Sequence, residues 1–71
     1  MSEIFFSNIL CNGEEKKVAA RNIEQLLVEL SLGEKKVAVE LNQEIIPRDS
    51  YLKTKLSDGD SIEIVHFVGG G

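Results

Sequence analysis

Hydrophobic and polar residues change their spacing several times along the chain, and each change marks a predicted element. Residues 4–11 are rich in β-branched and aromatic side chains and end at the dipeptide Asn12-Gly13. Both residues of this dipeptide tolerate the positive φ of a type I′ turn, so it predicts a β-hairpin. Charged residues follow at 14–17, after which the apolar residues 18–20 predict a short return strand.

The spacing then changes to that of a helix. Over residues 22–32 the apolar side chains recur at i, i+3, i+4 and i+7, which places four of them on one stripe: Ile23, Leu26, Leu27 and Leu30. Asn22 is the predicted N-cap, and Gln25 stands three residues later, as in a capping box. Gly33 is expected to supply the left-handed residue that ends the helix.

Two shorter strands are predicted after the helix. Residues 37–41 alternate between large apolar positions and small or polar ones, as in a half-buried strand. Asn42-Gln43 predicts a turn, and residues 44–46 predict a short strand that leads back. Pro47 closes this strand because proline lacks the N–H that a sheet would bond.

The last third of the chain contains one more predicted strand. Residues 48–53 are expected to be irregular or to form a short helical turn, with Tyr51 and Leu52 packed beneath it. Residues 58–60, with the sequence Asp-Gly-Asp, predict a turn before a final strand over residues 61–68. The order of elements therefore predicts an α+β fold, in which one helix covers one face of a sheet.

The composition fits one small acidic domain. The 71 residues include 12 acidic and 8 basic side chains, for a formal net charge of −4. Residues 1–71 are expected to form a single domain, because a chain of this length supports one hydrophobic core. The basic residues are expected to be scattered; they are Lys16, Lys17, Arg21, Lys35, Lys36, Arg48, Lys53 and Lys55. An acidic chain without a basic stripe argues against nucleic acid and anionic membranes as partners.

The numbers of cysteines and histidines and the first residues of the chain argue against a disulfide-bonded, a zinc-binding, a secreted and a membrane-spanning protein. Cys11 is the one cysteine and His66 the one histidine, which are too few for an intrachain disulfide or a zinc site of its own. We expect Cys11 to be a small buried hydrophobe and His66 a packed or edge residue. Glu3 stands where a signal peptide carries positive charge, and the following apolar run is too short for a membrane span. A cytoplasmic protein is therefore expected.

The end of the chain is the first feature that indicates a function. Val68 is followed by Gly69, Gly70 and Gly71, and glycine without a Cβ can thread a narrow cleft in a partner. The carboxylate of Gly71 is ionised at neutral pH and is a poor electrophile, so it needs activation, most simply as an acyl-adenylate. The chain has no phosphate-binding glycine loop, which means that a partner must bind the ATP. The alternative is that the glycines are incidental.

The final predicted strand is the second such feature, because it is apolar on both faces. If the isoleucines at 62 and 64 face the helix, Val65 and Phe67 point outward beside the tail. Together with Val68 they form a candidate docking patch for a partner. Single exposed apolar residues are ordinary, so the alternative is that the patch has no function. Neither feature supplies a catalytic constellation, and an autonomous enzyme is not expected.

Several of these segments taken together resemble one known family. They are the hairpin Asn12-Gly13, the helix with Leu26, Leu27 and Leu30, residues 42–48 (NQEIIPR), residues 58–65 (DGDSIEIV) and the Gly-Gly end. In combination they resemble the ThiS family, the sulfur carriers of thiamin biosynthesis, over about residues 9–71. The resemblance implies a ubiquitin-like β-grasp fold, with a mixed sheet of four to five strands packed on one main helix.

The resemblance also implies partners and site residues. A ThiF-type enzyme would use ATP and magnesium to adenylate Gly71, and a cysteine desulfurase or rhodanese-type protein would supply sulfur for a thiocarboxylate. The thiazole synthase ThiG would consume that sulfur. Gly70 and Gly69 would thread into the partner, and Val65 and Phe67 would lie on the docking face. The chain itself would hold no cofactor and no metal.

Three alternatives share parts of this pattern. A MoaD-like carrier of molybdopterin synthesis has the same fold and the same Gly-Gly end. A ubiquitin-like modifier would pass its activated carboxylate to a lysine amine instead of sulfur. A plain interaction module would not use the glycines at all. The chain also departs from the family in residues 1–8, which extend beyond the usual start, and in its third glycine, Gly69.

Overall fold

The structure of the chain is a computed structural model that describes residues 5–33 and 35–67. Strands dominate the described part, with one α-helix after the first hairpin and a short 3₁₀ helix before the last strand. In chain order the elements are β1 (Ser7–Cys11), β2 (Glu14–Val18), α1 (Ile23–Glu29), β3 (Val37–Leu41), β4 (Glu44–Ile46), η1 (Arg48–Ser50) and β5 (Ser61–His66).

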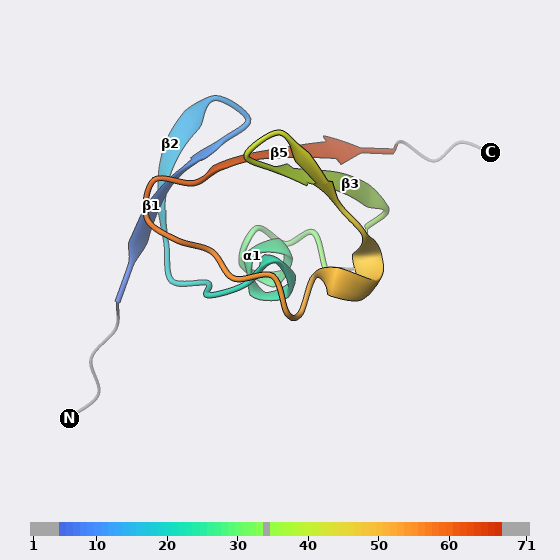
Figure 1. Cartoon of the computed structure of the whole chain (residues 1–71), viewed down its shortest axis with the longest axis horizontal. Coiled ribbons are helices and arrows are strands. Elements are labelled where there is room, and N and C mark those ends of the chain that lie inside the picture. The colour runs from blue at the N-terminus through green and yellow to red at the C-terminus, as the bar shows by residue number, and fades with distance from the viewer. Residues whose placement is uncertain (1–4, 34, 68–71) are drawn as a thin grey trace.

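The strands form one mixed sheet in the order β2-β1-β5-β3-β4, so the last strand of the chain is the central one. β5 runs parallel to β1, with Leu10 opposite Ser61 and Cys11 opposite Ile62, and antiparallel to β3. The sheet curves over α1, which lies against one of its faces (Figure 1). This arrangement is a β-grasp fold and confirms the predicted α+β class.

The first hairpin has the predicted turn but a different return strand. Asn12 and Gly13 have φ values of 52° and 83°, as a type I′ turn requires. The prediction of a return strand over residues 18–20 is wrong, because β2 is formed by Glu14–Val18. A two-residue turn places Glu14 directly opposite Cys11, so the charged residues must pair with β1. They are tolerated because β2 is an edge strand with one solvated side.

The helix begins as predicted. The Asn22 side chain accepts a hydrogen bond of 2.8 Å from the Gln25 amide, which confirms Asn22 as the N-cap. The Gln25 side chain in turn accepts one of 2.8 Å from the amide of Arg21. The segment before the helix is also tied to its far end, since the Glu29 carboxylate accepts from the Ala20 amide at 2.9 Å.

The helix ends differently from the prediction. Ser31, with a φ of 63°, is the left-handed residue, and Gly33 has no positive φ, so the assignment of Gly33 as the stop is wrong. The Ser31 amide donates to the Val28 carbonyl at 3.0 Å and the Leu32 amide to the Leu27 carbonyl at 2.6 Å, which is a Schellman motif. The earlier turn allows Leu32 to pack against the core.

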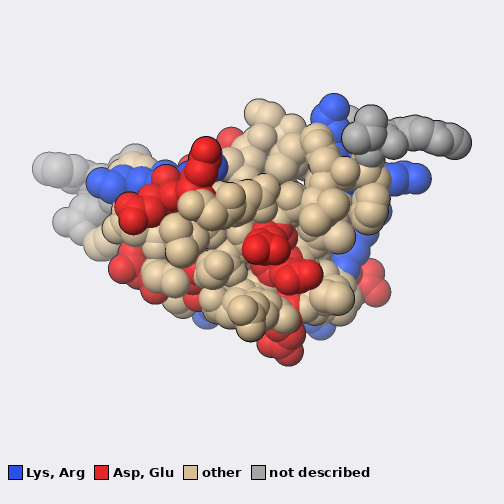
Figure 2. Space-filling model, turned by 90° about the horizontal axis from the view of Figure 1, so that it is seen from above, with Lys and Arg blue, Asp and Glu red and all other residues tan. Residues whose placement is uncertain are grey.

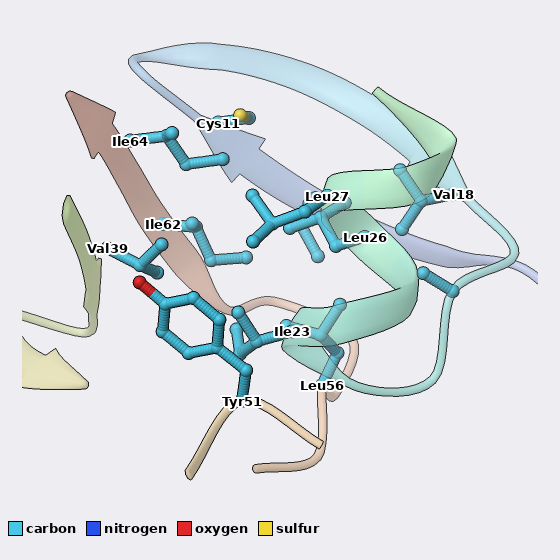
Figure 3. Close-up of a cluster of buried hydrophobic side chains, with 12 residues drawn as sticks. Cys11, Val18, Ile23, Leu26, Leu27, Val39, Tyr51, Leu56, Ile62 and Ile64 are labelled. Atoms are coloured by element: carbon cyan, nitrogen blue, oxygen red, sulfur yellow. The ribbon is translucent and has the colours of Figure 1, made fainter. Parts of the chain in front are cut away.

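The hydrophobic core lies between α1 and the inner face of the sheet. Its buried side chains come from every layer of the fold (Figure 3): Ile9, Cys11, Val18, Ala20, Ile23, Leu26, Leu27, Val39, Tyr51, Leu56, Ile62 and Ile64. Tyr51 is buried as predicted, but Leu52 is 70% exposed, so the prediction that Leu52 packs beneath the turn is wrong. The Tyr51 ring fills the space next to Val39 (Figure 3), which leaves no buried position there for the neighbouring Leu52.

The prediction that the final strand includes Phe67 is wrong. β5 ends at His66, and Phe67 lies just after it, while Val68 lies outside the described residues. Within residues 5–33 and 35–67, no helix is long and apolar enough to cross a membrane.

Candidate functional site

The C-terminal end of β5 is held by β3 and by the residue directly before β3. β3 pairs with β5 as far as Val37 opposite His66, and the Phe67 amide donates to the Lys36 carbonyl at 3.0 Å. The chain is therefore anchored to the sheet up to Phe67. The predicted tail residues Val68, Gly69, Gly70 and Gly71 come directly after this anchor and lie outside the described residues.

Asn12 supports β5 from the side of β1. Its side-chain oxygen accepts from the Ile64 amide at 2.8 Å, and its side-chain nitrogen donates to the Ile64 carbonyl at 3.2 Å. The amide group thus continues the hydrogen-bond ladder at the point where β1 turns away into the hairpin. The sequence predicted Asn12 only as a turn residue. Its second role depends on a strand some 50 residues away, which no local pattern signals.

Asn42 supports the beginning of β5 from the side of β3. The Ser61 amide donates to the Asn42 side-chain oxygen at 2.9 Å, and the Asn42 amide donates to the Ser61 carbonyl at 2.7 Å. The Asn42 side-chain nitrogen donates to the Asp60 carboxylate at 3.1 Å. Asparagines in both hairpin turns therefore fix the strand that leads to the predicted tail.

The two faces of β5 differ as the sequence predicts. Ile62 and Ile64 point into the core, whereas Val65 and Phe67 are 56% and 59% exposed on the outer face of the sheet. Ala38 lies opposite Val65 in register on β3 and is also exposed. An apolar patch of Val65, Phe67 and Ala38 therefore lies immediately before residue 68; we call it the outer patch.

Two acidic side chains lie beside the outer patch. Glu40 and Glu63 are direct cross-strand partners on the same face. Seen from above the sheet, acidic side chains occupy the middle of the surface, with uncharged residues around them (Figure 2). Like charges placed directly opposite each other disfavour the fold slightly. The face can contact a protein surface that combines apolar and positively charged groups.

Neither predicted chemistry-bearing side chain forms a catalytic arrangement. Cys11 is buried, and this burial raises the pKa of its thiol, which keeps the reactive thiolate rare at neutral pH. His66 is exposed at the end of β5, opposite Val37, which fits an edge histidine. Among the described residues, no three His, Cys, Asp or Glu side chains are close enough together to hold a metal ion.

The expectation that the basic residues are scattered is wrong for three of them. Arg21, Lys53 and Lys55 line the same groove, although more than 30 positions separate the first from the others in the sequence. The segment before α1 packs against the segment after η1, which brings the three side chains to one end of the molecule. This groove lies away from the outer patch.

Comparison with known proteins gives consistent matches. The model of the ThiS family matches residues 8–71. The chain is 53% identical over 49 residues to the sulfur carrier protein ThiS of Bacillus subtilis, covering 69% of this chain and 74% of that protein. The crystal structure of the thiamine biosynthesis protein ThiS from Geobacter metallireducens superposes with a TM-score of 0.76. Its sequence identity is 35%, and the match covers 90% of this chain and 99% of that one.

A longer protein also matches. The chain is 48% identical over 64 residues to a thiazole synthase of Paramagnetospirillum magneticum, which covers 89% of this chain. It spans only 20% of that relative's length. A segment similar to this small domain therefore occurs inside a much larger protein.

Proposed function

Because this chain belongs to the ThiS family, we propose that it is a sulfur carrier of thiamine biosynthesis whose Gly71 carries the sulfur as a thiocarboxylate. The observation that carries the proposal is the family match, which extends to residue 71. The β-grasp fold supports it, since the central strand of the sheet leads directly into the glycine tail.

The proposed reaction has three steps at the Gly71 carboxylate. A ThiF-type adenylyltransferase binds ATP and magnesium, and a carboxylate oxygen attacks the α-phosphorus, so that pyrophosphate leaves. The outer sulfur of a persulfide on a cysteine desulfurase or a rhodanese-type protein then attacks the acyl carbon of the adenylate, AMP leaves, and an acyl disulfide joins the two proteins. A thiol, such as free cysteine, reduces this S–S bond, which releases the Gly71 thiocarboxylate and leaves a disulfide between the thiol and the donor cysteine. The first step is needed because an ionised carboxylate resists nucleophilic attack. In this proposal the chain is the substrate of its partners and no enzyme itself.

Thiazole synthase is the proposed acceptor of the sulfur. Two proteins named thiazole synthase contain a segment that is 48% or 43% identical to this chain. The presence of a carrier-like segment within these proteins supports a functional link between the two. In the proposed cycle the thiocarboxylate passes its sulfur to this enzyme, which regenerates the Gly71 carboxylate.

The outer patch is the proposed recognition surface for these partners. Val65 and Phe67 expose apolar side chains shortly before the tail, and Val68 is the next residue in the sequence. A partner that covers the patch positions Gly69 and Gly70 to enter its active site. Glycine suits this role because a narrow channel excludes any larger side chain.

Intact-mass spectrometry tests the proposal directly. The chain is incubated with a ThiF-type enzyme, ATP, magnesium, a cysteine desulfurase and cysteine. We expect the mass to rise by the difference between one sulfur and one oxygen atom. The rise is absent without ATP, and a variant with one alanine added after Gly71 provides the matched control, because it keeps every described contact and moves the carboxylate.

Three outcomes would contradict the proposal. An unchanged mass with an enzyme that modifies a known carrier would exclude this activation. Modification of the extended variant at the same rate would show that Gly71 is not the reacting residue. Formation of higher-mass amide conjugates with lysines, without the sulfur-bearing form, would indicate a protein modifier instead.

A further inference from the structure

A groove lies at the opposite end of the molecule from the outer patch. It is formed where the segment before α1 and the segment after η1 run side by side, below the sheet in Figure 1. Asn22 and Lys55 form an isolated β-bridge there, and the Leu56 amide donates to the Arg21 carbonyl at 2.9 Å. The groove has a volume of about 440 Å³.

Two of the residues that line the groove are large, exposed apolar side chains. Phe5 and Leu52, which both line it, are 65% and 70% exposed. Ala20 and Leu56, also in the lining, are buried and continue the apolar surface inward to the core. Large apolar side chains that gather around a concave site indicate a binding surface more often than apolar residues that are exposed singly.

The charge of the groove is opposite to that of the whole chain. Arg21, Lys53 and Lys55 line it, and none of the Asp and Glu residues that the structure describes does, although acidic side chains outnumber basic ones by 12 to 8 in the sequence. Within residues 5–33 and 35–67, none of these three basic side chains forms an ion pair. The described lining of the groove is therefore positively charged.

We propose that this groove binds an acidic segment of a partner protein, with an apolar side chain of that segment against Phe5 and Leu52. Carboxylates on either side of the apolar residue complement Arg21, Lys53 and Lys55. Charge complementarity of this kind contributes mainly to specificity and to the rate of association, while the apolar contact supplies affinity. An apolar lining with basic groups suits an extended peptide better than a small anion, which needs polar groups that converge on it.

The position of the groove separates it from the sulfur-transfer site. Ser7, at the beginning of β1, lines the groove, whereas Leu10 is the residue opposite the first residue of β5. Because β1 and β5 are parallel, the groove lies beyond the start of β5 and the outer patch lies at its end. An acidic partner can therefore hold the chain while another protein engages the tail. The inference stands independently of the proposed function.

Amide NMR with a defined peptide tests this inference. The probe is a short capped peptide with a central Leu-Phe pair flanked by glutamates, titrated into the ¹⁵N-labelled chain. We expect saturable shifts at the amides of Arg21, Leu52 and Lys53, with those of Val65 and Phe67 unmoved. A peptide with glutamine in place of glutamate should bind about tenfold more weakly, as should the double variant Lys53→Glu/Lys55→Glu.

Two further variants make the result decisive. Lys35→Glu/Arg48→Glu changes the net charge by the same amount outside the groove, and we expect it to bind the probe as the original chain does. Leu52→Ser removes apolar contact without altering charge, and we expect it to weaken binding, which serves as a second test should the charge reversal impair folding. Both variants replace exposed side chains, and circular dichroism verifies their fold.

Several outcomes would overturn the inference. If the glutamine peptide binds as tightly as the glutamate peptide, charge has no role in binding. If the shifts are confined to the outer patch, the probe binds there and not in the groove. Absence of saturable shifts would exclude the site. Shifts at the groove that depend on the concentration of the chain alone would show that a second copy, and not an acidic partner, occupies it.

Discussion

Alternation along β5 gives neighbouring residues opposite roles. Ile62 and Ile64 are buried in the core. Val65, on the outer face of the strand, and Phe67, just beyond its end, are each more than half exposed. The exposed pair contributes little to stability, because its side chains gain little from burial. The proposed contact with a partner would give these two side chains a role other than stability.

Phe67 provides the sharpest test of this role. Phe67→Asp should change the free energy of unfolding by no more than about 0.5 kcal/mol, since the side chain is exposed. The same change should lower the rate of sulfur loading at limiting carrier by about tenfold or more, because a charge disfavours an apolar interface. Chemical denaturation and the mass assay measure the two effects separately.

The matched variants are Phe67→Leu, which keeps the apolar character, and Val28→Glu, which places a charge at an exposed apolar site on α1. Both should load sulfur normally. A loss of folding in Phe67→Asp would assign Phe67 to the core, and equal loading of all three variants would remove the outer patch from recognition.

Ser31 stands in a conformation that glycine adopts with less strain. Its φ of 63° ends the helix, whereas Gly33, two positions later, has no positive φ. Ser31→Gly should therefore raise the free energy of unfolding by about 0.5–1 kcal/mol. Gly33→Ala should be tolerated, because its Cβ would lie 3.4 Å from Val28 Cγ2, an ordinary contact. Thermal unfolding compares the two, and a loss of stability above about 1 kcal/mol in Gly33→Ala would contradict the observed helix end.

At the scale of elements, the parallel pair of β1 and β5 is the shortest pairing of the sheet. Only two residue pairs join these strands, compared with five between β3 and β5. The side chain of Asn12 extends the short pair by two hydrogen bonds to Ile64. A turn residue thereby stabilises the central strand of the sheet.

This role of Asn12 is separable from its role in the turn. Asn12→Gly keeps a residue suited to positive φ but leaves the backbone groups of Ile64 without their partner. We expect a loss of about 1–2 kcal/mol in the free energy of unfolding. Gln43→Gly is the matched control: Gln43 has a φ of 71° in the second hairpin, and its side chain forms no hydrogen bond with any residue that the structure describes, so we expect a gain of about 0.5–1 kcal/mol.

Urea denaturation measures both variants under the same conditions. Equal stability of Asn12→Gly and the original chain would show that solvent satisfies Ile64 as well as the amide does. A loss of stability in Gln43→Gly would show that the second turn does not carry the strain assigned to it.

At the scale of the whole molecule, the two proposed binding surfaces lie at opposite ends of a small sheet. The outer patch and the tail lie at the end of β5, and the basic groove lies beyond its start. The net charge of −4 is distributed unevenly, with acidic residues on the outer face and three basic ones at the groove. If both proposals hold, the separation of the two surfaces would allow two partners to bind at once.

The sequence alone determined the features that depend on neighbouring residues. The type I′ turn at Asn12-Gly13, the N-cap Asn22, the apolar stripe of α1 and the parity of β5 all follow from local sterics and periodicity, and the structure confirms each of them. The glycines and the segment patterns also indicated the family that the comparisons show. Each of these local features depends only on residues that lie within a few positions of one another in the sequence.

Tertiary structure decided what depends on residues that are distant in the chain. The left-handed residue that ends the helix is Ser31 and not the predicted Gly33, because Leu32 packs against a core to which other elements contribute. Leu52 is exposed because Tyr51 occupies the buried space beneath the turn. The side-chain amide of Asn12 bonds to Ile64, about 50 positions later in the chain. Arg21 and Lys53 became neighbours only when two segments packed together. Which side chains are buried depends on the packing of the whole fold, and a local sequence pattern does not predict it.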